Sequence, residues 1–211
     1  MELYEAIARR RTVREFRSDP VPETSIRRVL AAGLRAPCNA HLKSWQFVLL
    51  RDRDRRRRAV AEGLGARDMK DPAEIERFLQ RFTDETLKAV YRRSLPRQLS
   101  MMLEAPEVLV VFYRMKPLAD CRSLFELNPL ASAWMCIENI VLALAAEGLY
   151  GCTYTPYDAA GLKEALGVPP GWEAAAIIPF GYAQTPPEPN EAEDVASRLH
   201  VEAWVEPGVS V

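Results

Sequence analysis

The feature that most constrains the fold is the apolar stretch from residue 130 to residue 149. Its length approaches the roughly 20 residues that a membrane-spanning helix needs. However, Glu138, Asn139 and Glu147 interrupt it, and these side chains would be costly in contact with lipid. Residues 131–146 are apolar nearly all the way round a helix, which is typical of a helix packed on several sides. The sequence therefore predicts a buried helix at the centre of a soluble core, with no membrane partner.

Length and charge bound what surrounds this helix. A chain of 211 residues with 48% hydrophobic residues fits one domain over residues 1–211. The 28 Lys and Arg residues nearly balance the 29 Asp and Glu residues, so no global field attracts nucleic acid. The run Arg55–Arg58 lacks interleaved aromatic residues, so we interpret it as a solvated helix face. We expect no nucleic-acid partner.

The cysteines and histidines indicate the compartment and exclude one class of site. The four cysteines form no C-x-x-C pair, and the N-terminus lacks the apolar stretch of a secretory signal, so we expect a reduced, cytoplasmic protein. His41 and His200 are the only histidines, too few for a histidine-rich metal centre. No metal site is expected.

The remaining pattern alternates helices with strands. Periodicity predicts helices at 2–9, from Pro22 to before Pro37, from 52 onward, within 71–104, and at 159–166. It predicts strands at 45–50, 108–113 and 174–180, and an extended segment at 152–155. This order favours an α/β or α+β sandwich. After the Pro-rich residues 184–190, apolar residues alternate again, so we expect the tail 184–211 to pack on a sheet edge or a partner subunit.

A cluster of positive charge follows the first helix. Arg10, Arg11, Thr12 and Arg14 lie within five residues. A guanidinium group can bind two phosphate oxygens at once, and the Thr12 hydroxyl adds a neutral donor. A phosphate clamp is one interpretation. The alternative is that these arginines only solvate a helix end and pair with Glu15 and Asp19.

Several common chemistries leave no signature. The sequence contains no G-x-G-x-x-G after a strand, no G-x-x-x-x-G-K-[ST] and no G-x-S-x-G, so a Rossmann site, a P-loop and a nucleophile elbow are unsupported. Cys38 with His41 resembles a nucleophile and base only weakly, because no third group to orient the base is evident.

Taken together, the motifs resemble the nitroreductase family. The matching segments lie in the family's order across nearly the whole chain: residues 6–16, 19–22, 36–39 leading into 45–48, Asn139, 145–149, 166–169 and 178–182. The resemblance implies a three-layer α+β sandwich in which a central, mostly antiparallel sheet is flanked by helices. It also implies an intertwined homodimer with two FMN molecules at the interface. An FMN-dependent oxidoreductase is therefore expected, passing hydride from NADH or NADPH through flavin N5 to a small acceptor such as a nitroaromatic, a quinone or an activated alkene.

The resemblance also assigns residues to the flavin. Arg10, Arg11 and Thr12 match the family segment that contacts the FMN phosphate. Arg14 matches the last basic residue of that segment, which approaches the flavin pyrimidine. Arg198 resembles a basic residue late in the family sequence that also reaches the phosphate. The other expected contacts are Pro37, Cys38, Asn39, His41 and Lys43 from the partner subunit, and Tyr154 and Thr155 near N5. No acid or base catalyst is required, and residues 71–104 are a candidate lid over the pocket.

The ring end of the expected site departs from the common family pattern. Cys38 stands where many members have Ser, and His41-Leu42-Lys43-Ser44 replaces Asn-x-Gln-Pro. Pro156 offers no N–H, so a donor to N5 must come from its neighbours. A cation such as Lys43 or Arg14 near the pyrimidine would raise the flavin's reduction potential. These departures leave three alternatives open: a flavin-dependent dehalogenase, a flavin-degrading relative, and an FMN-binding protein without turnover.

Overall fold

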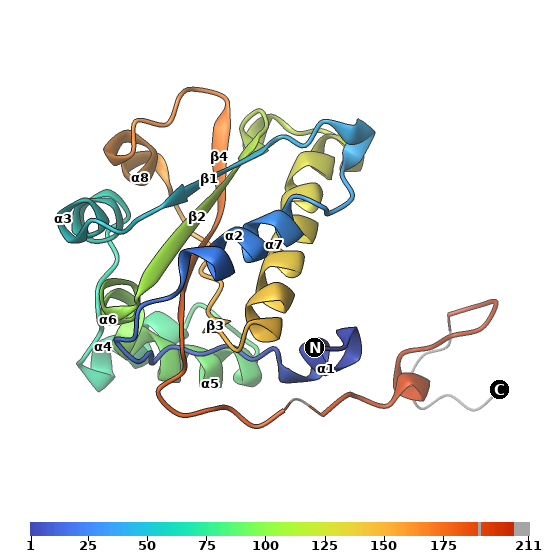
Figure 1. Ribbon diagram of the computed structural model, residues 1–211, viewed down its shortest axis with the longest axis horizontal. Helices are drawn as coiled ribbons and strands as arrows, with labels where there is room; N and C mark the ends of the chain where they lie inside the picture. Colours follow the sequence, from blue (N-terminus) through green and yellow to red (C-terminus); the bar gives the residue numbers. More distant parts are fainter. Residues whose placement is uncertain (190, 205–211) are drawn as a thin grey trace.

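The computed structural model describes residues 1–189 and 191–204 and is built around one antiparallel sheet (Figure 1). The strands are β1 (Trp45–Leu49), β2 (Glu107–Arg114), β3 (Tyr150–Gly151) and β4 (Trp172–Gly181), in the order β1-β2-β4-β3. All neighbouring strands are antiparallel. The strands predicted at 45–50, 108–113 and 174–180 are confirmed. The predicted segment 152–155 forms only an isolated bridge, between Tyr154 and Ile177.

Strand β2 is the centre of the sheet and is buried on both faces. Leu109 and Val111 join one hydrophobic cluster, whereas Val108 and Val110 join the other, as the two-residue period of a strand requires. The register shifts between Val111 and Phe112, where β4 has one extra residue. The two clusters separate three layers, which confirms the predicted three-layer α+β sandwich.

Helices α2 (Glu23–Gly33) and α7 (Asn128–Ala146) cover one face of the sheet (Figure 1). They approach closely at Gly33, where an added Cβ would lie 2.6 Å from a side-chain carbon of Ile140. Asn139 Nδ2 donates to the Ala32 carbonyl at 3.1 Å. The polar residue inside the apolar stretch therefore joins the two helices, and α7 is the predicted central helix.

Helix α7 ends in a glycine turn. Gly148 has φ 71°, its N–H donates to Ala145, and the Leu149 N–H donates to Leu144, which together satisfy the last carbonyls of the helix. Glu147 pairs with Arg28 of α2 at 2.6 Å. By length and composition alone, Leu124–Ala146 could cross a membrane. Its packing against α2 and the sheet is that of a core helix.

The opposite face of the sheet is covered by short helices. They are α3 (Arg53–Arg57), the π-helical η2 (Arg58–Gly63), α6 (Gln98–Glu104) and α8 (Ala160–Ala165). The Ala160 N–H at the start of α8 donates to the carboxylate of Asp158, the residue before the N-cap Ala159. Gly161 allows the close packing of α8 on η2, since a Cβ there would lie 2.3 Å from the Gly63 carbonyl oxygen.

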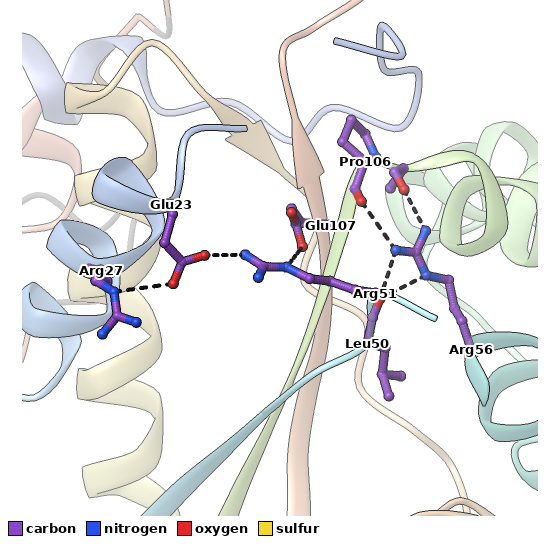
Figure 2. A network of polar contacts seen from close by, with 8 residues as sticks. Glu23, Arg27, Leu50, Arg51, Arg56, Pro106 and Glu107 are labelled. Carbon is purple, nitrogen blue, oxygen red and sulfur yellow. Dashed lines mark hydrogen bonds and ion pairs between the residues drawn. The ribbon is translucent and has the colours of Figure 1, made fainter. Parts of the chain in front are cut away.

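One prediction for this face is wrong at a single residue, Arg56, whereas Arg55, Arg57 and Arg58 are exposed as expected. The run Arg55–Arg58 is not a uniformly solvated helix face, because Arg56 is buried (Figure 2). Its guanidinium donates to the carbonyls of Leu50 (2.7 Å), Pro106 (3.1 Å) and Ala105. Burial lowers the pKa of Arg56, which Glu107 partly offsets. The Leu50 carbonyl directly follows β1, and the Ala105 and Pro106 carbonyls directly precede β2. Arg56 therefore satisfies backbone acceptors at the ends of these two strands.

Residues 71–104 are helical, as predicted. Residues 71–97 form a small unit with its own hydrophobic cluster at the bottom of Figure 1, whereas α6 packs on the sheet. Helices α4 (Pro72–Leu79) and α5 (Glu85–Ser94) begin at the capping carboxylates of Asp71 and Asp84. The turn η3 (Leu95–Arg97) leads into α6. Phe82 and Tyr91 stack at 4.9 Å beside Phe78, so aromatic contacts hold α4 against α5.

The two ends of the chain lie outside the layers. At the N-terminus, helix α1 (Leu3–Arg9) precedes the arginine cluster, and near the C-terminus the tail contains the 3-10 turn η6 (Val195–Ser197). Three further 3-10 turns lie in loops within the chain: η1 (Asn39–His41), η4 (Leu118–Asp120) and η5 (Leu124–Leu127). The tail runs away from the body in Figure 1 and forms no strand within its described part. Leu199, Val201 and Trp204 are exposed. Residues 190 and 205–211 of the predicted packing tail lie outside the described residues, and its partner stays a prediction.

Candidate functional site

The arginine cluster lies on a backbone segment that is fixed along the end of the sheet. Helix α1 ends at Arg9, and Thr12 then pairs with Gly151 of β3 in a parallel bridge. The Val13 N–H donates to the Gly151 carbonyl at 3.1 Å, and the Arg17 N–H donates to Tyr182 at 2.9 Å. The Arg10 N–H also donates to the Ala6 carbonyl at 3.0 Å, so hydrogen bonds fix the main chain on both sides of Arg11 and of Arg14.

Arg10, Arg11 and Thr12 line a cavity of about 90 Å³. Its other walls come from α7, including Glu138, and from the segment Tyr150–Gly151 with Thr153. Two guanidinium groups and a hydroxyl at one small cavity have the chemistry of a phosphate site. Glu138 was not predicted for this site, because on the sequence it only interrupted an apolar helix.

The carboxylates proposed to neutralise this cluster are engaged elsewhere. Asp19 pairs with Arg17 at 2.7 Å, and this hydrogen bond holds the pKa of Asp19 below its usual range. Glu15 lies 3.6 Å from Arg97. Within the described residues, the ion pairs of Glu15 and Asp19 are therefore with Arg97 and Arg17.

A second cavity, of about 240 Å³, lies next to the first and shares Thr153 with it. Arg14 and the segment 152–155 form one side, and α5 with the start of α6 forms the other. Burial raises the pKa of the Cys152 thiol, although the neighbouring Arg14 guanidinium opposes that shift. Arg14 therefore lies beside Cys152 at the wall of this cavity.

The backbone of residues 152–155 distinguishes the two predicted ring contacts. The Tyr154 N–H donates to Ile177 at 2.8 Å, and the Tyr154 carbonyl accepts from the Ile177 N–H at 2.8 Å. Tyr154 therefore has no N–H left for a ligand, and burial raises the pKa of its half-buried phenol. Among the described residues, the N–H of Thr155 has no acceptor. Thr155, not Tyr154, can supply a backbone donor there.

The predicted partner-side contacts gather in a separate loop after α2. Pro37 and Cys38 lead into this loop, where the Asn39 N–H donates to Ser132 Oγ at 3.0 Å and the Lys43 N–H donates to Cys38 Sγ at 3.3 Å. His41 and Lys43 have φ of 57° and 44°, left-handed values that cost energy for residues other than glycine. The loop is exposed and strained, as functional loops often are.

One chain does not bring the loop and the arginine cluster together. The loop contacts Ser132 at the start of α7, whereas Thr12 pairs with Gly151, which follows the other end of α7. Ser132 and Ala145 are thirteen residues apart on α7, about 20 Å along the axis. The cavity lined by Arg10–Thr12 extends along α7 from Ala145 toward Trp134. Figure 1 shows the two regions at opposite ends of α7.

Arg198 is also apart from the cluster. It lies in the tail directly after η6, and its Nε donates to Glu193 at 2.8 Å. The tail leaves the body of the chain before this point (Figure 1). Within one chain, the predicted phosphate contact from Arg198 is therefore not formed.

Helix α5 contributes side chains that sequence reasoning did not assign. Leu87, Val90 and Tyr91 line the larger cavity opposite Arg14. The sequence marked this region only as helical, and helical periodicity does not tell which face meets a cavity. No cluster of potential metal ligands occurs in the part of the chain that the structure describes.

The geometry accords with a comparison against protein-family models, in which residues 7–182 match the model described as the Nitroreductase family. The chain belongs to the nitroreductase family.

The chain is similar to family members that carry different names. It is 24% identical over 185 residues to an iodotyrosine deiodinase of Nematostella vectensis, covering 86% of this chain and 67% of the relative. It is 25% identical over 177 residues to an NADH dehydrogenase of Thermus thermophilus, covering 84% of each chain. A crystal structure of oxidized iodotyrosine deiodinase bound to FMN and 3-iodo-L-tyrosine superposes with a TM-score of 0.69 at 20% identity, covering 99% of this chain and 100% of that one.

Proposed function

We propose that this chain is an FMN-dependent oxidoreductase that passes hydride from NADH or NADPH to a small acceptor. The observation that carries the proposal is the pair of adjoining cavities, one lined by Arg10–Thr12 and the other by Arg14 and Thr155, in a chain of the nitroreductase family. The acceptors that we consider are nitroaromatics, quinones and activated alkenes.

The residues present fit FMN in kind and in order. Arg10, Arg11 and Thr12 would hold the phosphate, because two guanidinium groups and a hydroxyl are its natural donors. Arg14 would support negative charge at the pyrimidine, and the free N–H of Thr155 would donate to the ring edge. Bound there, FMN would supply hydride chemistry. The protein would position both substrates and keep water out.

A second copy of the chain would complete the site. Cys38, Asn39, His41 and Lys43 would contact the flavin of the partner, since in their own chain the loop and the arginine cluster lie at opposite ends of α7. Exposed apolar side chains support a partner surface around α1 and α7, among them Tyr4 and Met135. The tail 184–211, including Arg198, would pack on this partner. We propose a cytoplasmic homodimer.

A second candidate is reductive dehalogenation, favoured by the similarity to iodotyrosine deiodinases. It needs the same flavin and the same residues around it, and differs in the acceptor. The flavin-degrading alternative differs in requiring oxygen.

Absorbance spectroscopy of the purified protein tests the proposal. We expect a flavin spectrum with one FMN per chain, loss of the oxidised-flavin band when NADH or NADPH is added without oxygen, and its return when an acceptor is added. A protein that takes up no FMN would refute the proposal. If the protein binds FMN but neither NADH nor NADPH reduces it, the result would support the alternative of an FMN-binding protein without turnover.

Product analysis separates the remaining candidates. Turnover of a nitroaromatic or quinone under nitrogen supports the oxidoreductase. Halide release from a haloaromatic supports the dehalogenase, and loss of FMN itself in air supports the flavin-degrading alternative.

A further inference from the structure

Helix α5 presents apolar side chains to the larger cavity instead of to the core of its own helical unit. Leu87 is 39% exposed and Val90 is 46% exposed, and both line the cavity that Arg14 and residues 152–155 bound on the other side. The adjoining aromatic cluster on α4 and α5 is already packed without them. Apolar side chains left at a cavity wall indicate an occupant with an apolar face.

The charge on the side chains that line this cavity is of one sign, positive. Arg14 is the one fully charged side chain among the described residues that line it, and none of these residues is a carboxylate. The carboxylates closest in sequence are already paired: Glu85 with Lys88 at 2.6 Å, and Glu15 at 3.6 Å from Arg97. A cationic ligand group in the cavity would thus face another cation and find no carboxylate.

An ammonium group that loses water without gaining an anionic partner is strongly disfavoured. We propose that the α5 side of this cavity, opposite the flavin ring that Arg14 and Thr155 would hold, is the acceptor pocket, and that it selects planar acceptors that are neutral or anionic and carry no ammonium group, with Leu87 and Val90 against their apolar edge. This inference rests on the proposed function, which places the flavin ring beside Arg14 and Thr155. It separates this chain from the relative whose structure holds 3-iodo-L-tyrosine, an amino acid with an ammonium group.

Three nitroaromatic acceptors test the charge preference directly. 3-(4-Nitrophenyl)propanoate and 4-nitro-L-phenylalanine differ only in the ammonium group, and 4-ethylnitrobenzene carries no charge. With the FMN-loaded protein, kcat/KM for 4-nitro-L-phenylalanine should be lower than for 3-(4-nitrophenyl)propanoate by about tenfold or more. The uncharged compound should be accepted as well as the propanoate, within about threefold.

A carboxylate placed on α5 should reverse the preference. Val90→Glu should raise the relative kcat/KM for 4-nitro-L-phenylalanine by about tenfold, because the new carboxylate can pair with its ammonium group. Leu34→Glu is the matched control, since Leu34 is also 46% exposed but lies at the end of α2, outside this cavity. The control should keep the wild-type ratio.

Calorimetry gives a readout that does not depend on turnover. The ligands are 3-phenylpropanoate and L-phenylalanine, which cannot be reduced, and the same preference is expected in their dissociation constants. Equal constants in the wild type, or the same ratio for Val90→Glu and Leu34→Glu, would overturn the inference. A protein that binds no FMN would overturn the proposed function instead, and the calorimetric ratio would still decide the charge preference of the cavity.

Discussion

Two arginine-rich segments of this chain look alike in sequence and differ in what their charges meet. In Arg51–Arg58, the inward-facing groups are satisfied by the protein: Arg56 by carbonyls, and Arg51 by Glu23 and Glu107 (Figure 2). In Arg10–Arg14, the side chains line two adjoining cavities. The comparison teaches that the density of arginine says little about its role. What matters is whether the side chain is buried against backbone acceptors, as Arg56 is, or lines a cavity that can admit a ligand.

The largest effect should come from Arg56. Arg56→Met removes the donor to three carbonyls at the ends of β1 and β2 and leaves them buried without partners. We expect the free energy of unfolding to fall by about 3 kcal/mol or more. Urea denaturation measures it. Arg55→Met, at an exposed position of the same run, should change stability by no more than about 0.5 kcal/mol. Equal losses in the two variants would break the distinction.

At the segment Arg10–Arg14, we expect substitutions to change the affinity for FMN. Arg10→Gln combined with Arg11→Gln should weaken FMN binding about 100-fold, because two charge-assisted contacts to phosphate are lost. Riboflavin, which has no phosphate, serves as the control ligand, and its dissociation constant should change by less than about threefold. Fluorescence titration of the apo protein measures both constants. If the two ligands lose affinity equally, the cluster does not bind the phosphate.

The smallest effect should come from the ion pairs of Arg51. This side chain is half exposed, so Arg51→Gln should cost about 0.5 to 1 kcal/mol of stability at neutral pH. The hydrogen bond from Arg51 holds the pKa of Glu23 below its usual range. A lowered folded-state pKa stabilises the fold above the ordinary carboxyl pKa, about 4.3, and this contribution disappears as the pH falls through the lowered value.

Denaturation of the wild type and Arg51→Gln at several pH values measures this contribution. The difference between the two proteins should be largest near neutral pH and shrink in acid. A difference that grows in acid would contradict the role given to this pair.

Much of the fold could be predicted from the sequence, because its signals are local. The period of α7 and the strand patterns depend on nearby residues, and each agrees with the structure. The fate of Arg56 could not be predicted, because its acceptors at Ala105 and Pro106 lie about 50 residues away in sequence. Single-sequence patterns do not show such pairs.

The candidate site likewise has a part that could be predicted from the sequence and a part that could not. The Arg10–Thr12 cluster is contiguous, so its place at one cavity follows the sequence motif. The choice of Thr155 over Tyr154 depends on which N–H groups pair with Ile177, and the cavity wall from α5 depends on how that helix packs. Both are tertiary features that local patterns do not encode.

A mixed dimer tests the central claim most directly, namely that Arg10–Thr12 of one copy and the loop of the other hold the same FMN. One tagged chain carries Arg10→Gln and Arg11→Gln, and the other carries His41→Asp and Lys43→Asp, since Asp tolerates the left-handed backbone there. Each variant alone should bind FMN weakly. The co-expressed mixed dimer, isolated through both tags, should regain one site of wild-type FMN affinity per dimer, because its second site combines two unaltered halves. A mixed dimer with no site of wild-type affinity would contradict the account.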